Sequence, residues 1–184
     1  AHLQDRDYIK TEILKGYAYP MYTFVPEAGK GWLDMDNLTS SSFTVGGVFS
    51  IPTVTIPSCW VTYNKTKAIE LLNAAGFTIG ADGETRIDPR YGGYLNPLIF
   101  YITLNDTARE ATGMKMTKEL TDLGIPVDAR VVVKTVCYES VMVEYNYHLY
   151  TGWHSFSPDS PDSLYGLFHS SQYWGHPDGK TILG

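Results

Sequence analysis

The stretch of residues 98–133 constrains the fold more than any other part of this sequence. Residues 98–104 are a run of β-favouring side chains, Asp106 is suited to cap a helix that continues to about Leu123, and residues 130–133 again favour a strand. This strand, helix and strand have the length of a crossover between two parallel strands. Because helices and strands alternate from Thr66 onward, the sequence predicts an α/β layer fold.

Three segments before this unit have clear boundaries. Residues 5–15 place apolar side chains at helical spacing and end at Gly16, which predicts a short amphipathic helix. Residues 67–75 are strong helix formers that end at Gly76. The pair Asp82-Gly83 then suits a tight turn between two strands, so a β-hairpin is expected directly after this helix.

The remaining segments are less regular. Between residues 17 and 63, prolines, a Gly-Gly pair and a polar cluster interrupt every long periodicity, which indicates irregular chain with one or two short strands. Residues 138–145 favour a helix, residues 147–153 a strand and residues 162–170 another short helix. A chain of 184 residues with 43% hydrophobic content is expected to form one domain.

Several separate motifs resemble those of one family. Residues 67–77, Lys-Ala-Ile-Glu-Leu-Leu-Asn-Ala-Ala-Gly-Phe, are similar to the family's K-A-x-x-L-L-x-x-A-G-F helix and are the most specific match. The other matches are D-R-x-x-I at residues 5–9, the Asp82-Gly83 turn with Arg86, Arg109 ahead of L-x-x-L-G-I at residues 120–125, and a strand, a tryptophan and an Asp/Pro-rich loop at residues 147–162. On these motifs the chain resembles the family 5 extracellular solute-binding proteins, of the oligopeptide, dipeptide and nickel type.

The resemblance implies a fold and a domain organisation. The implied fold is one α/β lobe of the class II periplasmic-binding-protein type (domain III of the family), with a mixed sheet and flanking helices. The match covers residues 66–170 and the first helix, whereas residues 27–57 match poorly and are interpreted as a divergent, loop-rich insertion. Because the family's first lobe has no counterpart here, residues 1–184 are interpreted as a single domain, the C-terminal ligand-binding lobe of a larger protein.

The resemblance also implies ligand-binding residues after the last predicted strand. Trp153 stands where the family has its cleft tryptophan, which offers a large and rigid apolar contact. Peptide-binding members carry an acid three residues later that meets the amino terminus of the ligand, but Phe156 stands there. Either Asp159 or Asp162 takes this role, or the ligand has no free amino group at that point. The full candidate set is Tyr150, Trp153, His154, Phe156, Asp159 and Asp162.

Composition argues against some classes of function. A net charge of −6 and a pI near 5.3 argue against nucleic-acid binding, which needs a basic face. No apolar run approaches the roughly 20 residues of a transmembrane helix. Three Asn-X-Thr sequons, at Asn37, Asn64 and Asn105, fit a secreted protein. Cys59 and Cys137 form either one disulfide or two buried thiols.

The resemblance implies that the protein is the extracytoplasmic substrate-binding component of an ABC transporter. The expected partners are a peptide or similar small solute, held in a cleft between lobes, and the permease subunits of the transporter. Contact with a membrane is expected only through an anchor or the transporter. No cofactor and no metal ligand is predicted.

Two alternatives and one exclusion accompany this prediction. A metal or metal-complex binder is one alternative, because several histidines fall in the last third of the chain near Asp159 and Asp162; they are His148, His154, His169 and His176. A sensor or receptor with the same fold is the other. The sequence carries no hydrolase, metalloprotease, phosphate-loop or dinucleotide motif, and Cys137 near His148 has no nucleophile context, so no catalysis is expected.

Overall fold

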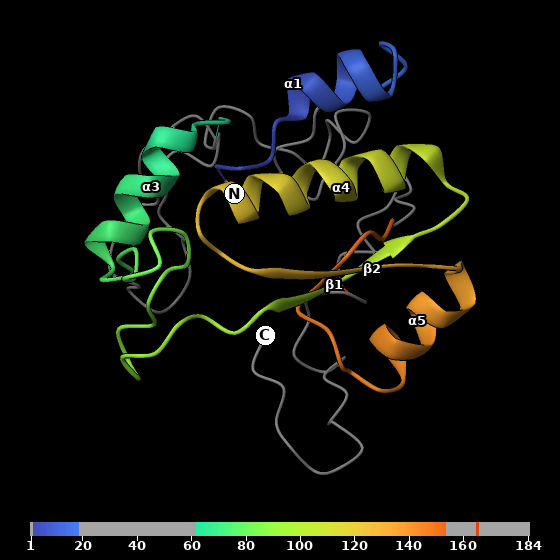
Figure 1. Cartoon of the computed structure of the whole chain (residues 1–184). Coiled ribbons are helices and arrows are strands. Elements are labelled where there is room, and N and C mark those ends of the chain that lie inside the picture. Colours follow the sequence, from blue (N-terminus) through green and yellow to red (C-terminus); the bar gives the residue numbers. More distant parts are fainter. Residues whose placement is uncertain (1, 19–61, 154–164, 166–184) are drawn as a thin grey trace, which may run out of the picture. The chain divides into compact units, whose positions relative to one another are not determined.

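The computed structural model describes residues 2–18, 62–153 and 165. Contacts between residues divide the chain into two units, and the first, Ala1–Pro20 with Val61–Trp153, contains all of these residues except Tyr165. Its elements are α1 Arg6–Tyr8, the π-helix η1 Ile9–Ile13, α3 Lys65–Ala74, β1 Leu98–Thr103, α4 Thr107–Asp122, β2 Val127–Val132, α5 Lys134–Met142 and β3 Leu149–Tyr150 (Figure 1). The predicted irregular region 27–57 and helix 162–170 lie outside the described residues, apart from residue 165.

The described sheet has three strands in the order β2-β1-β3, and both pairings are parallel. Leu98 pairs with Val127 and Thr103 with Val132, so the predicted parallel crossover is confirmed. The strand β3 pairs with β1 over two residues only. Antiparallel pairing in the described residues is limited to two isolated bridges around the Asp82-Gly83 turn and the loop after it. The α/β fold predicted from the sequence is thus confirmed, with the described strands forming a small parallel sheet.

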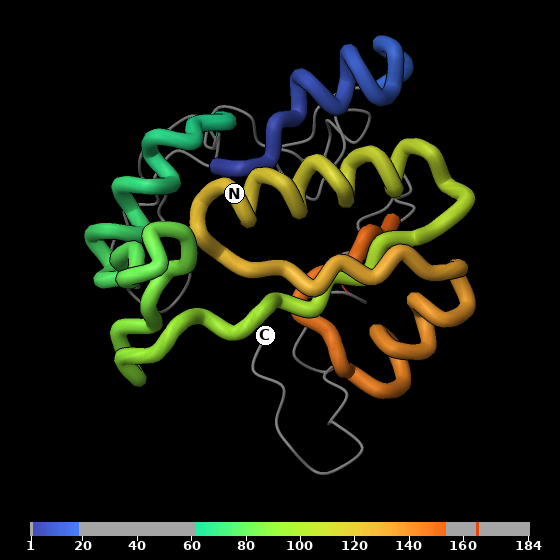
Figure 2. Tube along the Cα trace, in the orientation of Figure 1, coloured from blue at the N-terminus to red at the C-terminus, as the bar shows by residue number. Residues whose placement is uncertain are grey.

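Helices α4 and α5 cover opposite faces of this sheet (Figures 1 and 2). The reason lies in β1, which is buried on both faces because successive side chains point to opposite sides. Ile102 faces α4, while Tyr101 packs in a buried cluster with Cys137 and Val141 of α5. Cys137 is a free, buried thiol, and Cys59 lies outside the described residues.

The contact between α4 and β1 depends on a glycine. Gly113 lies in the middle of α4, and a Cβ atom built on it would be 2.8 Å from Cγ1 of Ile102, which is completely buried. Non-bonded carbon atoms prefer separations of about 3.5–4.0 Å. The helix therefore approaches the strand more closely than any larger residue at position 113 would allow.

Buried Arg86 joins the carboxyl-terminal ends of two helices. Its Nε donates to the carbonyl of Leu123 (2.5 Å) at the end of α4, and its Nη1 donates to Oδ1 of Asn73 (2.8 Å) in α3 and to the carbonyl of Phe77. The partial negative charge at a helix carboxyl terminus attracts a cation. Arg86 thus fixes the end of α3 against the end of α4.

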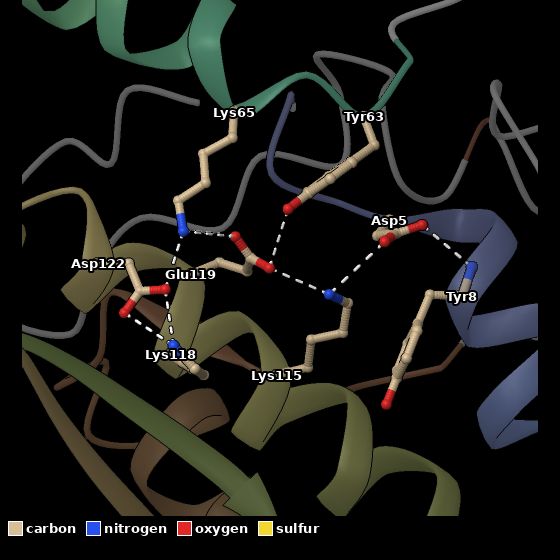
Figure 3. A network of polar contacts seen from close by, with 8 residues as sticks. All are labelled: Asp5, Tyr8, Tyr63, Lys65, Lys115, Lys118, Glu119 and Asp122. Carbon is tan, nitrogen blue, oxygen red and sulfur yellow. Dashed lines mark hydrogen bonds and ion pairs between the residues drawn. The ribbon is translucent and has the colours of Figure 1, made fainter.

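A charged network holds the amino-terminal segment on α4 (Figure 3). The ammonium group of Lys115 ion-pairs with Glu119 (3.1 Å) and Asp5 (3.6 Å), and it lies 4.5 Å from the ring centre of Tyr8 and 5.4 Å from that of Tyr63. Burial alone would raise the pKa of Glu119, but hydrogen bonds from Lys115 and Tyr63 outweigh it and the pKa is lowered. The network therefore favours the ionised carboxylate at this buried position.

Most predicted boundaries hold, and four differ. The strand predicted at residues 130–133 begins three residues earlier, at Val127, and ends at Val132. The predicted first helix is confirmed, but it is short and largely a π-helix. The helix predicted at residues 138–145 begins four residues earlier, at Lys134, because β2 ends at Val132 and the chain enters α5 directly. The strand predicted at residues 147–153 has only two residues in the ladder. None of the helices that the structure describes is long and apolar enough to cross a membrane.

Candidate functional site

The carboxyl ends of the three strands define one edge of the sheet. Because the three described strands are parallel, the carboxyl ends of β1, β2 and β3, at Thr103, Val132 and Tyr150, lie at the same edge. The chain leaves β1 through α4 to reach β2, then passes through α5 to reach β3 on the other side of β1. The connections therefore diverge between β1 and β3, and in open α/β sheets ligands bind outside the carboxyl ends at such a point.

Two threonines hold the chain at this point after the ladder of β3 ends. The backbone N–H of Thr103 donates to Oγ1 of Thr151 (2.9 Å), and Oγ1 of Thr103 donates to the carbonyl of Thr151 (3.2 Å). The N–H of Thr151 donates to the carbonyl of Tyr101 (3.0 Å). Side-chain hydrogen bonds thus replace the sheet ladder and fix the direction in which the chain continues to Trp153.

A pocket of about 520 Å³ lies along α4 and β3 and reaches this edge at Arg109 and Thr151. Its walls come from residues 3–4, from Phe100 of β1, from one face of α4 between Ala108 and Leu120, and from residues 149–152. The lining is mostly apolar, and its volume lies in the range of small-molecule sites, roughly 300–1,000 Å³. The described part of the chain therefore offers a preformed wall for a small ligand.

Trp153 and Arg109 lie together beside the pocket. The Trp153 side chain is 56% exposed, and an exposed aromatic side chain of this size beside a pocket is typical of a contact surface. The guanidinium carbon of Arg109 lies 5.8 Å from its ring centre, within reach of a cation–π interaction. Arg109 is held from the other side by Asp106, with 3.0 Å between Nε and Oδ2.

Tyr150 both lines the pocket and packs against the buried cluster beside α5, and the sequence could not tell which face of the strand it occupies. It lines the pocket, but its ring packs edge-on against Tyr147, with 5.5 Å between ring centres, and against the buried cluster beside α5. Burial raises the pKa of its hydroxyl, and the neighbouring Tyr147 adds to the effect. A Cβ on Gly152 would overlap this ring. Tyr150 therefore supports the path of residues 151–153 as much as it borders the pocket.

Of the six candidate residues predicted from the sequence, the structure describes two. Trp153 lies at the carboxyl edge and Tyr150 beside it, whereas His154, Phe156, Asp159 and Asp162 lie outside the described residues. Sequence reasoning did not predict that Arg109, Thr151 and Gly152 line the pocket. Arg109 could have been found, because it lies in the first turn of a helix that directly follows a parallel strand, where α/β folds place their sites.

Neither a metal site built from histidines nor a nucleophile at Cys137 is supported by the described residues. The N–H of His148 donates to the carbonyl of Ile99 (3.0 Å), and its Nδ1 accepts from the N–H of Ile99 (2.9 Å). Cys137 is buried next to Thr103, with 3.9 Å between Sγ and Oγ1. No group of three or more metal-ligating side chains occurs in the part of the chain that is described. His154, His169 and His176 lie outside it.

A parallel α/β unit with a mostly apolar pocket that reaches the carboxyl ends of its strands is an architecture in which many proteins bind ligands. Comparison with known proteins shows the family. The chain belongs to the bacterial extracellular solute-binding proteins, family 5, because the sequence model of the middle region of that family matches residues 1–175. The family resemblance of the sequence motifs is thereby confirmed. No curated protein sequence matches the chain.

Solved structures of several solute-binding proteins share the fold. The oligopeptide-binding protein AppA from Bacillus subtilis, in complex with a nonapeptide, has a TM-score of 0.69 and 19% identity, over 93% of this chain and 29% of AppA. NikZ from Campylobacter jejuni, in complex with Ni(L-His), has a TM-score of 0.64 and 21% identity, over 93% of this chain and 28% of NikZ. NikA from Brucella suis, in complex with Fe(III)-EDTA, has a TM-score of 0.63 and 16% identity, over 93% of this chain and 29% of NikA. The chain thus spans less than a third of the length of these proteins.

Proposed function

We propose that this protein is the substrate-binding component of an ABC transporter and that it holds a small solute outside the cytoplasm. The observation that carries the proposal is the mostly apolar pocket of about 520 Å³ that runs along α4 and β3 and reaches the carboxyl edge of the sheet near Trp153, which is exposed. Such a protein binds its ligand without transforming it, so its partners are the ligand and the permease subunits.

We also propose that residues 1–184 form one lobe of the complete binding protein. The chain spans only 28–29% of the solved proteins AppA, NikZ and NikA. If the remainder of the complete protein supplies the opposite wall, ligand binding closes two lobes and removes the pocket from water. On this proposal the chain alone holds half of the site and binds more weakly than the full-length product of its gene.

Two ligand classes follow from the solved structures. Peptides are the first, because AppA is in complex with a nonapeptide. Metal chelates are the second, because NikZ and NikA are in complex with Ni(L-His) and Fe(III)-EDTA. The absence of a cluster of metal ligands among the described residues favours a complete chelate over a bare ion.

Ligand screening of the purified, full-length protein tests the proposal. The melting temperature is measured with a panel of di- to nonapeptides and of nickel and iron chelates, because a ligand that binds only the folded state raises it. Hits are confirmed by calorimetry with the wild type and with Trp153→Ala. We expect at least one class to bind and Trp153→Ala to weaken binding about tenfold or more. Absence of binding across both classes would contradict the proposal.

A further inference from the structure

We propose that Asn64 is the attachment site of an N-linked glycan and that Asn105 is not. The proposal rests on the proposed function for one point, the location outside the cytoplasm, because N-linked glycans are a feature of secreted surfaces. It adds a covalent modification of this protein and the residue that carries it.

The asparagines of this chain are concentrated in acceptor sequences. Three of the six asparagines, Asn37, Asn64 and Asn105, stand two residues before a threonine, with no proline between. Threonine makes up 18 of the 184 residues, so fewer than one Asn-X-Thr sequence would be expected by chance among six asparagines. Asn37 lies outside the described residues, so the structure compares Asn64 with Asn105.

The side chain of Asn64 uses one atom to hold its position and leaves another available. Its Oδ1 accepts the backbone N–H of Lys67 (2.8 Å) and so caps α3, and its own backbone N–H donates to the carbonyl of His2 (2.9 Å). Its Nδ2 makes no hydrogen bond to a described residue, and both Asn64 and Thr66 are exposed. A substituent on Nδ2 leaves Oδ1 free to accept, so the modified residue still caps the helix.

The transfer step needs a donor that the cell supplies. Nδ2 attacks the anomeric carbon of an oligosaccharide carried on a polyprenyl phosphate or diphosphate. A bond forms between this nitrogen and the anomeric carbon, and the bond from that carbon to the phosphate oxygen breaks. The electron pair leaves on the phosphate, and the amide nitrogen loses one proton. A membrane-bound transferase catalyses the step, and this chain contributes only the acceptor amide.

Asn64 lies near the end of α4 that is far from the ligand site. The next residue, Lys65, ion-pairs with Asp122 (2.8 Å), the last residue of α4 (Figure 3). The other end of α4 begins at the carboxyl edge of the sheet, and its 16 residues span about 24 Å at 1.5 Å per residue. A glycan at Asn64 therefore has room on the surface without covering that edge.

Asn105 has the opposite location. It is exposed in the turn between β1 and α4, with a φ of +65°, and it precedes Asp106, whose carboxylate binds Arg109. This turn is at the carboxyl edge, where the proposed function brings the ligand and the opposite lobe. A glycan here would fill the space into which the lobes close, so ligand binding by closure requires Asn105 to stay unmodified.

Mass spectrometry of the full-length protein, purified from the organism that carries its gene, tests the proposal. Peptides are fragmented by electron transfer, which preserves the bond between sugar and asparagine and so locates the modified residue. We expect the peptide with Asn64 to carry an oligosaccharide in most molecules and the peptide with Asn105 to carry none.

Threonine variants expressed in the same organism separate the glycan from the helix cap. Thr66→Ala destroys the acceptor sequence but keeps Asn64 as the cap of α3, so we expect complete loss of the glycan from a folded protein. Thr66→Ser retains an acceptor sequence and should retain the glycan. Thr107→Ala is the matched control at the other sequence and should leave the glycan mass unchanged. Melting temperatures confirm that the variants are folded.

The outcomes are independent of the ligand screen. An unmodified Asn64 would overturn the proposal, and so would a glycan at Asn105 or one that persists in Thr66→Ala. An unmodified protein that binds a member of the ligand panel leaves the proposed function intact. A protein with a glycan at Asn64 that binds no member of the panel supports the modification and contradicts the proposed function.

Discussion

The close approach of α4 to β1 at Gly113 allows a quantitative test of the fold that carries Arg109. In Gly113→Ala, the new Cβ would lie 2.8, 2.9 and 3.0 Å from three side-chain carbons of Ile102, which is fully buried and cannot turn away into solvent. Overpacking of this kind costs about 1–3 kcal/mol. Alanine is favoured over glycine in a helix by about 1 kcal/mol. Since all three contacts are severe, we expect a net destabilisation of about 1–2 kcal/mol.

Urea denaturation followed by circular dichroism measures this difference in the free energy of unfolding. Met114→Ala is the control, because Met114 is a half-exposed neighbour in the same helix. Ile102→Ala alone is expected to cost about 2–5 kcal/mol. In the double variant the methyl group introduced at position 113 enters the space that Ile102 vacates, so the combined loss should be at least about 1 kcal/mol smaller than the sum. A Gly113→Ala protein as stable as the wild type, or additive losses, would refute the reasoning.

Three further predictions concern other contacts. Arg86→Met should lower the free energy of unfolding in urea by about 2–4 kcal/mol, because it leaves buried carbonyls at two helix ends without their charged donor, while exposed Lys67→Met should change it by less than about 0.5 kcal/mol. Hydrogen bonds from Lys118 and Lys65 lower the pKa of Asp122 from 3.8 to about 2, so its stabilisation is present above pH 3.8 and is lost as the pH falls toward 2. Urea midpoints measured across that range should fall less steeply in Asp122→Asn than in the wild type. Gly152→Ala should weaken ligand binding, measured by calorimetry, because the new methyl group displaces the ring of Tyr150. Adding Tyr150→Leu to this variant should restore part of the affinity, and a double variant without any restoration would contradict the proposed contact between the two residues.

The sequence predicts best those elements whose ends are determined by residues close by in the chain. Asp106 caps α4, as expected, and glycines with positive φ end α3 and α4, because only a residue without Cβ adopts that conformation freely. The displaced start of α5 has a tertiary cause. Valines in this region favour a strand by propensity, but Cys137 and Val141, one helical turn apart, are buried against Tyr101.

The short β3 has a similar explanation. Its sequence favours a strand over seven residues, but only Phe100 and Tyr101 of β1 pair with it. The hydroxyl groups of Thr103 and Thr151 then take over the hydrogen bonds that a longer ladder would make. β1 itself continues to Thr103, so the ladder ends because of these side-chain hydrogen bonds and not because the neighbouring strand stops.

The site itself could be predicted only in part, because it joins residues from distant segments. The pairing of Arg109 with Trp153 follows from the strand order, which brings the first turn of α4 and the end of β3 to one edge. The other candidate residues, at positions 154–162, lie outside the described residues, so their prediction rests on the motif alone. A motif fixes the order of residues along the chain, whereas a site depends on which segments the strand order brings together.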